Sequence, residues 1–440
     1  MSPSVEKVMS RVWQIAIHGT FDVENYGDLL FPVIAEEELS RRLGAVQMHR
    51  FSYHAKSAAQ WPYAVTSLTE LPKIAHRLDA TLIGGGFIIR FDKFVAENYL
   101  PPSPSIHHPT GYWLTPALMA VQHGVPLIWN APGMHCNDVP EWARPLLKLV
   151  IEQSPHVKVR DALSQATLQQ LTEHGRVEVL PDTAFGLPRL LDLQAPSAEL
   201  NNLRSQYGLD GPYLVVHAIG GLERFLDLWR RHSAEFTDLR LLVVPIGPVL
   251  GDHASALGEP LDRSVTLPFW PSPLLLAELI AHSVGVVGHS YHLAISAIAF
   301  GLPVFCSADL KNGKYTALPA YGRVFQVSHD QELDPHWFAR QLGRRPLPAA
   351  TRQAAAQLDE HWDRVAELVV AGRVAEPEGL SRFWQSLPMQ LENLQARQTE
   401  SLQAQRIELE ASRRQLAQLP MSDLRRLYHL FKRFFARSTQ

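Results

Sequence analysis

Short apolar runs rich in β-branched residues recur along the 440-residue chain, and each is followed by a longer segment with helical periodicity. This alternation limits the possible folds more than any other feature, because strands that alternate with helices form parallel sheets covered on both faces. The chain carries two series of such runs. The strand-like runs are Trp13–Ile17, Ala45–His49, Ala80–Ile83, Pro126–Asn130, Val157–Val159 and Val177–Leu180 in the first series, and Tyr213–His217, Leu239–Pro245, Ser264–Leu267, Gly285–Val287 and Val304–Phe305 in the second.

A polar stretch over residues 192–212 interrupts the alternation, and we place a domain boundary there. The predicted fold is therefore α/β, with two tandem Rossmann-like domains over residues 1–195 and 196–345 and a ligand-binding cleft between them. Residues 346–388 are expected to form helices that pack back on this body.

The C-terminal segment, residues 389–440, has a different character. Residues 389–419 contain many Gln, Glu and Arg residues and leucines in an imperfect heptad, which predicts a long exposed helix that self-associates as a weak coiled coil. Residues 421–440 predict an amphipathic tail helix with leucine and aromatic residues on one side and basic residues on the other. Such a helix suits the anionic inner face of the cell membrane, or packing on the protein itself or on a partner subunit.

The composition excludes several classes of protein. A net charge of −3 gives no reason to expect a nucleic-acid partner. The two cysteines, Cys136 and Cys306, cannot supply a disulfide framework or a zinc site. The sequence shows neither a signal-peptide pattern nor a run of about 18 apolar residues that could cross a membrane. We therefore expect a cytoplasmic protein.

A polar, turn-rich phrase follows the first predicted strand. It contains Asn25, Tyr26, Gly27 and Asp28, and either Asn25 or Asp28 would cap a helix that begins near Leu29. Because the phrase lies at the carboxyl end of a parallel strand, we expect it to face the cleft.

Two further groups follow strands of the first domain. Gly84, Gly85 and Gly86 could bring backbone amides close to a phosphate or carboxylate, although a tight turn explains them equally well. The G-x-G-x-x-G spacing of dinucleotide sites is absent, which disfavours a nicotinamide cofactor. Arg160 could grip an anion or pair with the acidic residue beside it, and Asp182 could orient an arginine, accept a sugar hydroxyl or cap a turn.

The densest group of reactive side chains lies in the second domain. His289, Ser290 and His292 stand at the start of a helix, where exposed amides favour an anion. His292 is a candidate acid–base residue, since an imidazole titrates near neutral pH. Lys311 and Lys314 follow the next strand and could add positive charge.

The chain resembles the polysaccharide pyruvyl transferase family in five phrases: NYGDLL at 25–30, LIGGGFI at 82–88, VRDALSQATL at 159–168, VLPDTAF at 179–185 and SYHLAISAIAFGLPV at 290–304. The resemblance implies a GT-B-like arrangement of the two domains. It also implies transfer of the enolpyruvyl group of phosphoenolpyruvate to a sugar, usually as a pyruvate ketal on a cell-surface glycan or its lipid-linked precursor. Such chemistry requires no metal and no nicotinamide cofactor.

The resemblance implies that Arg160 contacts the phosphate or carboxylate of the donor and that His292 acts on the donor. We add Asp28 as a second catalytic candidate, on the acceptor side. The other donor-side candidates are Gly84, Gly85, Gly86, His289, Ser290, Lys311 and Lys314, and the acceptor-side or structural candidates are Asn25, Tyr26 and Asp182.

One position departs from the family. Well-studied members carry an Arg-x-His triplet where this chain has Ser290, Tyr291 and His292, so a bidentate anion ligand is missing unless Lys311 or Lys314 replaces it. Two alternatives therefore stay open: a GT-B-type glycosyltransferase that uses a nucleotide sugar, and an inactive scaffold in glycan assembly.

Overall fold

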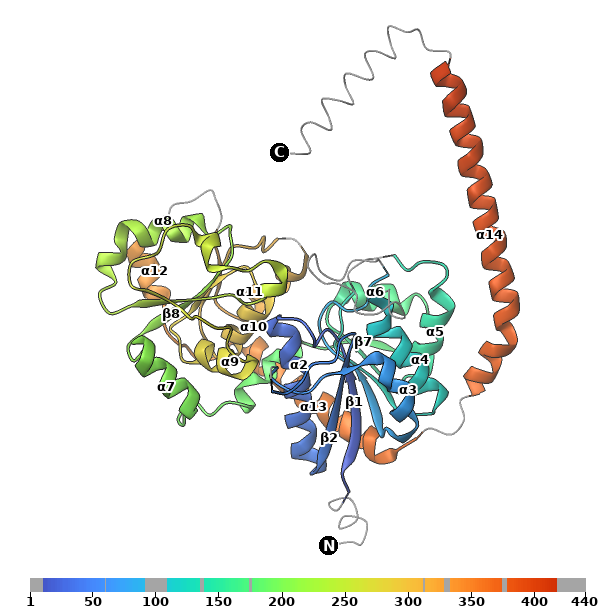
Figure 1. Ribbon diagram of the computed structural model, residues 1–440, viewed down its shortest axis with the longest axis horizontal. Coiled ribbons are helices and arrows are strands. Elements are labelled where there is room, and N and C mark those ends of the chain that lie inside the picture. Colours follow the sequence, from blue (N-terminus) through green and yellow to red (C-terminus); the bar gives the residue numbers. More distant parts are fainter. Residues whose placement is uncertain are drawn as a thin grey trace. The chain divides into compact units, whose positions relative to one another are not determined.

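Two parallel β-sheets with flanking helices form the larger of the chain's two units, residues 1–380 (Figure 1). The second unit, residues 381–440, consists in its described part of a long helix. The computed structural model describes residues 11–59, 61–91, 109–134, 138–173, 176–311, 313–327, 333–373 and 378–417.

The first sheet and its helices make up the first lobe of the larger unit. All strand pairs in the sheet are parallel, and the strand order is β3-β2-β1-β4-β5-β6-β7. The strands are β1 (Trp13–His18), β2 (Val46–Ser52), β3 (Thr66–Ser67), β4 (Ala80–Ile83), β5 (Leu127–Asn130), β6 (His156–Val159) and β7 (Val177–Val179). Every strand predicted for this sheet is confirmed, and the one described strand of this sheet that the sequence did not predict is β3, which is too short to show a pattern.

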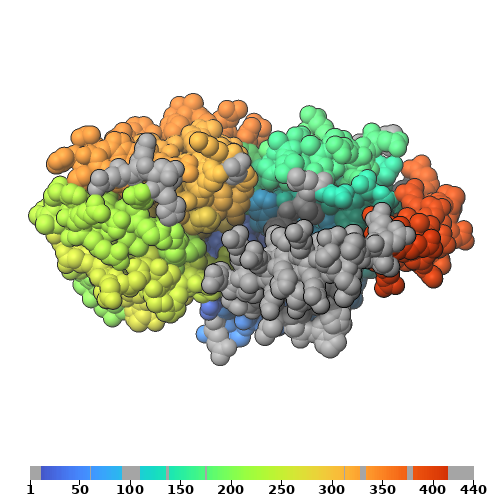
Figure 2. All heavy atoms as spheres, turned by 90° about the horizontal axis from the view of Figure 1, so that it is seen from above, coloured from blue at the N-terminus to red at the C-terminus, as the bar shows by residue number. Residues whose placement is uncertain are grey.

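The second sheet and its helices make up the second lobe, which lies beside the first (Figure 2). Its strands are also parallel, in the order β10-β9-β8-β11-β12-β13. They are β8 (Tyr213–His217), β9 (Arg240–Val244), β10 (Ser264–Thr266), β11 (Val286–Gly288), β12 (Val304–Cys306) and β13 (Val324–Gln326). The short strand β13 was not predicted.

Helices connect the strands and cover the sheets. Those of the first lobe are α2 (Tyr26–Leu43), α3 (Leu71–Ile74), α4 (Leu114–Gln122), α5 (Arg144–Glu152), α6 (Ala162–Gln169) and the 3₁₀ segment η4 (Thr183–Arg189). Those of the second are α7 (Ala198–Tyr207), α8 (Glu223–His232), α9 (Pro273–Ala281), α10 (Tyr291–Ala299), α11 (Leu318–Tyr321) and α12 (Pro335–Gln341).

Two longer helices follow the second lobe. Helix α13 (Ala349–Ala371) returns to the first lobe, where Asp359 forms ion pairs with Arg42 of α2 and Arg189 of η4. Helix α14 (Glu378–Ala417) confirms the long C-terminal helix, and the predicted tail helix at 421–440 lies outside the described residues. None of the described helices combines the length and the apolar character needed to cross a membrane.

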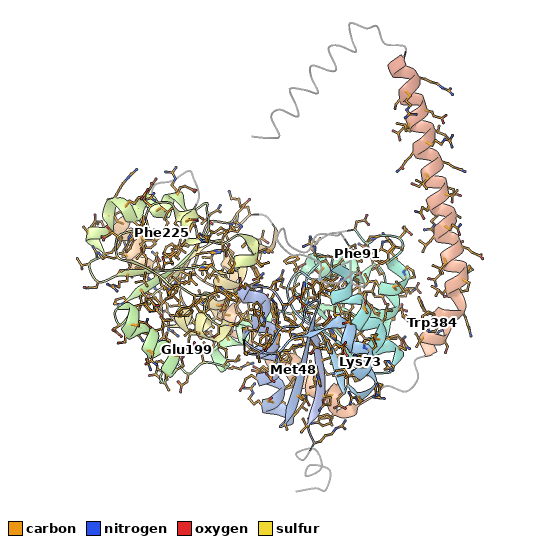
Figure 3. All side chains as sticks on the ribbon, in the orientation of Figure 1. Met48, Lys73, Phe91, Glu199, Phe225 and Trp384 are labelled. Atoms are coloured by element: carbon orange, nitrogen blue, oxygen red, sulfur yellow. The ribbon has the colours of Figure 1, made fainter. Side chains whose placement is uncertain are left out.

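One hydrophobic cluster runs through both lobes. It contains Ile15 and Leu82 from the first sheet, Val215 and Leu242 from the second, and side chains of α2, α9, α10 and α13. Separate clusters cover the remaining faces, and Phe225, labelled in Figure 3, belongs to the one in the second lobe. The two lobes therefore share a core instead of meeting only at their surfaces.

Helix α2 joins the lobes at its first turn. The helix begins at Tyr26, earlier than the predicted start near Leu29, and the side chain of Asn25 makes no capping hydrogen bond. Instead, the Tyr26 N–H donates to the carbonyl of Ile246 in the second lobe at 2.9 Å. The buried Tyr26 hydroxyl also forms a 2.8 Å hydrogen bond with Ser296 Oγ of α10. A hydrogen bond to the second lobe thus satisfies the N-terminus of α2, in place of the local side-chain cap that the sequence predicted.

Replacing Tyr26 with Phe should lower the free energy of unfolding by about 1 kcal/mol, because the buried Ser296 hydroxyl loses its partner across the lobes. Urea unfolding would measure the change. Tyr63→Phe is a matched comparison with a similar expected loss, since the Tyr63 hydroxyl donates to Leu29 O within the first lobe. An unchanged unfolding midpoint in Tyr26→Phe would contradict the proposed contact.

Candidate active site

A cavity of about 400 Å³ lies between the carboxyl ends of the two sheets. In each sheet the direction of strand addition reverses, between β1 and β4 in the first and between β8 and β11 in the second. Loops diverge at such a reversal and leave a crevice where ligands bind in open α/β sheets. The lining residues are Thr20, Val23, Asn25, Asp28, Gly86, Phe87, Ile88, Arg90, Tyr112 and Arg160 from the first lobe, and His217, Ile219, Ile246, Gly247, Val249, Leu250, Asp252, His289, Ser290, Tyr291, His292, Lys314 and Tyr315 from the second.

Arg160 projects into this cavity from the end of β6. Its guanidinium lies 3.9 Å from the centre of the Phe87 ring and 5.0 Å from that of Tyr291, and one nitrogen, Nη1, is 3.5 Å from Asp182 Oδ2. The other terminal nitrogen, Nη2, is buried and has no hydrogen-bond partner among the described residues. A fixed guanidinium with an unused donor suits an anionic ligand.

Asp182 connects Arg160 with His292. The carboxylate is buried, caps η4 by accepting the Ala184 N–H at 3.0 Å, and lies 3.4 Å from His292 Nε2. Burial alone would raise the pKa of Asp182, but His292, Arg160 and the Ala184 amide outweigh it and lower the pKa to about 2. Asp182 is therefore ionised at neutral pH and holds Arg160 and His292 at the cavity wall.

Gly27 makes room for His292. A Cβ atom on Gly27 would lie 1.9 Å from His292 Nδ1, so the imidazole occupies the space that any other residue would fill. This imidazole also lies nearly perpendicular to the Phe31 ring, with ring centres 5.4 Å apart. Helix α2 of one lobe therefore positions the histidine of the other.

Asp28 lies in the first turn of α2 and lines the cavity. Burial raises the pKa of its carboxyl group, against the opposing effects of His292 and of a hydrogen bond with Thr20. Gly86 adopts a positive φ of 85°, and a Cβ there would approach Asp28 Oδ1 to 2.9 Å. A carboxyl group with a raised pKa beside cationic groups is suited to proton transfer.

Of the two lysines from the sequence, Lys314 lines the cavity, whereas Lys311 is exposed and is not among the lining residues. Although part of the Lys314 side chain reaches solvent, its ammonium group lies between 5.2 and 5.8 Å from the ring centres of Tyr315, Phe87 and Tyr291. Desolvation in the cavity, followed by repulsion from Arg160, lowers the pKa of Lys314 to about 8.

Some of the remaining predicted residues line the cavity, and the others make only structural contacts. The Gly84 N–H donates to His18 O at 2.8 Å, Gly85 packs against Phe31, and of the three glycines only Gly86 lines the cavity. Asn25, His289 and Ser290 also line it, and Ser290 Oγ caps α10 by accepting the Leu293 N–H. Tyr26 instead joins the lobes, as described above.

The sequence did not single out His217 and Asp252, which form a buried hydrogen bond in the cavity wall. Because His217 Nδ1 accepts the His289 N–H at 3.3 Å, His217 Nε2 carries the proton that Asp252 accepts. Asp252 in turn accepts the N–H groups of Ile246 and Gly247 at 3.0 and 2.6 Å. His217 could have been predicted as a site residue because it ends a predicted strand, whereas no pattern in the sequence around Asp252 indicates a site residue.

No group of three or more His, Cys, Asp or Glu side chains within the described ranges is arranged to hold a metal ion.

Burial, followed by the effect of His217, lowers the pKa of His289, so this imidazole is neutral at physiological pH.

The fold and the cavity between its lobes define a two-lobed α/β protein of GT-B-like architecture. The chain belongs to the polysaccharide pyruvyl transferase family, whose model matches residues 25–308, and it is therefore a transferase. The match includes Arg160, Asp182 and His292, while Lys314 lies beyond its end. No curated protein matches the chain.

Among solved structures, the chain is similar to the UDP-GlcNAc 2-epimerase from Methanocaldococcus jannaschii, with a TM-score of 0.55 and 12% identity over 82% of this chain and 100% of that one. A structure of the epimerase from the same organism in complex with UDP-GlcNAc and UDP gives a TM-score of 0.50 and 11% identity, with the same coverage. At this identity the similarity defines the fold alone.

Gly27→Ala should displace His292 and lower the free energy of unfolding by about 1–3 kcal/mol, because the new methyl group overlaps the imidazole. Urea unfolding and the imidazole NMR signals would report both effects. Gly220→Ala is the control, since a Cβ there meets no atom within 4 Å. A wild-type His292 signal in Gly27→Ala would contradict this interpretation.

Proposed function

We propose that the protein transfers the enolpyruvyl group of phosphoenolpyruvate to a sugar of a cell-surface polysaccharide or of its lipid-linked precursor, forming a pyruvate ketal. The observation that carries this proposal is the convergence of Arg160, His292 and Lys314 on one cavity in a member of this family. The proposed route uses no cofactor beyond the donor itself.

The donor is a small molecule with two anionic groups, a phosphate and a carboxylate. Arg160 Nη2 supplies one fixed donor, and Lys314 stands over the same aromatic rings, Phe87 and Tyr291. The amides at the start of α10, beside His289 and Ser290, add a partial positive charge. In this proposal Lys314 compensates for the arginine that the family carries at position 290.

The proposed chemistry starts with a proton transfer from His292 to the methylene carbon of phosphoenolpyruvate, which leaves a cationic centre at C2. A sugar hydroxyl bonds to C2 and loses its proton, the C2–O bond to phosphate breaks, and inorganic phosphate leaves. A second hydroxyl then bonds to C2, loses its proton and closes the ketal. Asp182 holds the imidazole in place, and Asp28 is the candidate to accept a proton on the acceptor side.

In this proposal the acceptor is presented at a membrane. We propose that residues 421–440 contact the inner face of the cell membrane and that residues 389–419 support self-association, both on the basis of their sequence patterns. In the described part of this segment, Leu391, Leu402 and Leu409 are exposed on α14, which leaves apolar side chains available for such contacts.

Calorimetric titration with phosphoenolpyruvate tests the proposal directly. We expect saturable binding by the wild type and at least about a tenfold loss of affinity in Arg160→Ala, because a charge-assisted anion contact is removed. His292→Ala should abolish transfer to an acceptor sugar. Arg176→Ala is the charge-matched control, since this arginine is exposed and pairs with Glu178 away from the cavity.

Other titration results would favour the alternatives. Binding of a nucleotide diphosphate sugar without phosphoenolpyruvate would replace the proposal with glycosyl transfer. Retained phosphoenolpyruvate binding without turnover on any acceptor would support the scaffold interpretation.

The affinity for phosphoenolpyruvate should fall as the pH rises through about 8, the pKa of Lys314, because the free protein loses the ammonium charge there. If binding requires the charged form, the dissociation constant should rise by up to about tenfold per pH unit above this value. Lys314→Arg should show a flat profile over the same range, since a guanidinium stays protonated. An equally flat wild-type profile would remove Lys314 from the donor site.

A further inference from the structure

A second cavity, of about 370 Å³, lies between the lobes and is lined by two tryptophans. Trp61 comes from the loop between β2 and β3, and Trp270 from the loop between β10 and α9. Pro62 and Pro271 follow the two tryptophans in the chain and line the cavity with Glu24 and Ser272. Both indole side chains are partly exposed, so their rings are accessible to a ligand.

The two indoles are held in fixed orientations. Trp61 Nε1 donates to Phe21 O at 2.8 Å, and Trp270 Nε1 donates to Pro245 O at 2.9 Å. Because each polar N–H is already satisfied inside the protein and both rings pack against the hydrophobic cluster that runs through both lobes, a ligand meets only the exposed apolar part of each ring. Fixed aromatic faces bind without losing side-chain entropy.

The tryptophan-lined cavity adjoins the candidate active site. Glu24 precedes Asn25, which lines the active-site cavity, and the Glu24 carbonyl accepts the N–H of Val249, another lining residue, at 3.3 Å. The carbonyl that holds Trp270 belongs to Pro245, directly before the lining residue Ile246. A chain-like ligand could therefore occupy both cavities at once.

The side chains that line this cavity suit the ring and the hydroxyl groups of a sugar. Its lining residues include the carboxylate of Glu24 and no lysine or arginine, while the Lys56 ammonium lies 4.8 Å from the centre of the Trp61 ring. The electropositive C–H groups of a sugar ring pack well on the electron-rich face of an indole. Glu24 and Ser272 supply acceptors for sugar hydroxyl groups.

We propose that the tryptophan-lined cavity binds a sugar residue of the acceptor glycan, next to the sugar that enters the active site. This inference rests on the proposed function, because it assigns to the protein an acceptor of more than one sugar unit.

Quenching of intrinsic tryptophan fluorescence by maltotriose, chitotriose and β-linked galactotriose, each compared with its monosaccharide, tests the proposal. At least one trisaccharide should quench the wild type at concentrations about tenfold lower than its monosaccharide. Trp270→Ala should weaken this binding by about tenfold, and Trp270→Phe should restore most of it because an aromatic face remains. Absence of quenching by all three trisaccharides would overturn the proposal.

Two further variants distinguish a loss of sugar binding from a folding defect in Trp270→Ala. Glu24→Gln changes an exposed side chain and should weaken trisaccharide binding several-fold, by removing a charged acceptor. Trp384→Ala removes an indole that is 55% exposed on α14 (Figure 3) and should bind like the wild type. Wild-type affinity in both Trp270→Ala and Glu24→Gln would overturn the proposal.

Titration of the same variants with phosphoenolpyruvate separates this inference from the proposed function. Normal phosphoenolpyruvate binding together with unaltered trisaccharide binding in Trp270→Ala would overturn the sugar site alone. Trisaccharide binding that depends on Trp270, in a protein that does not bind phosphoenolpyruvate, would support the sugar site and reject the donor assignment.

Discussion

The packing of α2 against α10 is the contact on which the rest of the structure depends. It brings side chains of both sheets into one hydrophobic cluster and satisfies the start of α2 through a carbonyl of the second lobe. The same contact places His292 in the space above Gly27 and sets the imidazole beside Asp182. The core and the candidate active site are therefore consequences of the same helix pair.

The electrostatics of the cavity follow from this arrangement. One ionised carboxylate, Asp182, is shared by Arg160 and His292, and a third basic group, Lys314, stands nearby with a pKa lowered to about 8. A second carboxyl group, that of Asp28, lines the same cavity, and burial raises its pKa. A raised pKa favours the neutral form of the Asp28 carboxyl group, which leaves Arg160 and Lys314 better able to bind an anionic ligand.

The sequence predicted the fold in most of its detail because the central strands are buried on both faces and read as continuous apolar runs. It predicted Arg160, Asp182 and His292 as candidates because each follows a strand or opens a helix in a recognisable phrase. It did not predict the start of α2, the partner of His217 or the role of Gly27, since each depends on contacts between residues far apart in the chain. The very short strands β3 and β13 carry too few residues to show a period.

The common core also bears on how a substrate enters. In a two-lobed protein whose halves meet at polar surfaces, the lobes can swing apart and close around a ligand. Here such a swing would expose the packed side chains of α2, α9 and α10 to water and break the hydrogen bond between Tyr26 and Ser296. The shared core thus opposes a separation of the lobes, and we expect a substrate to enter the cavity through movement of the loops that line it.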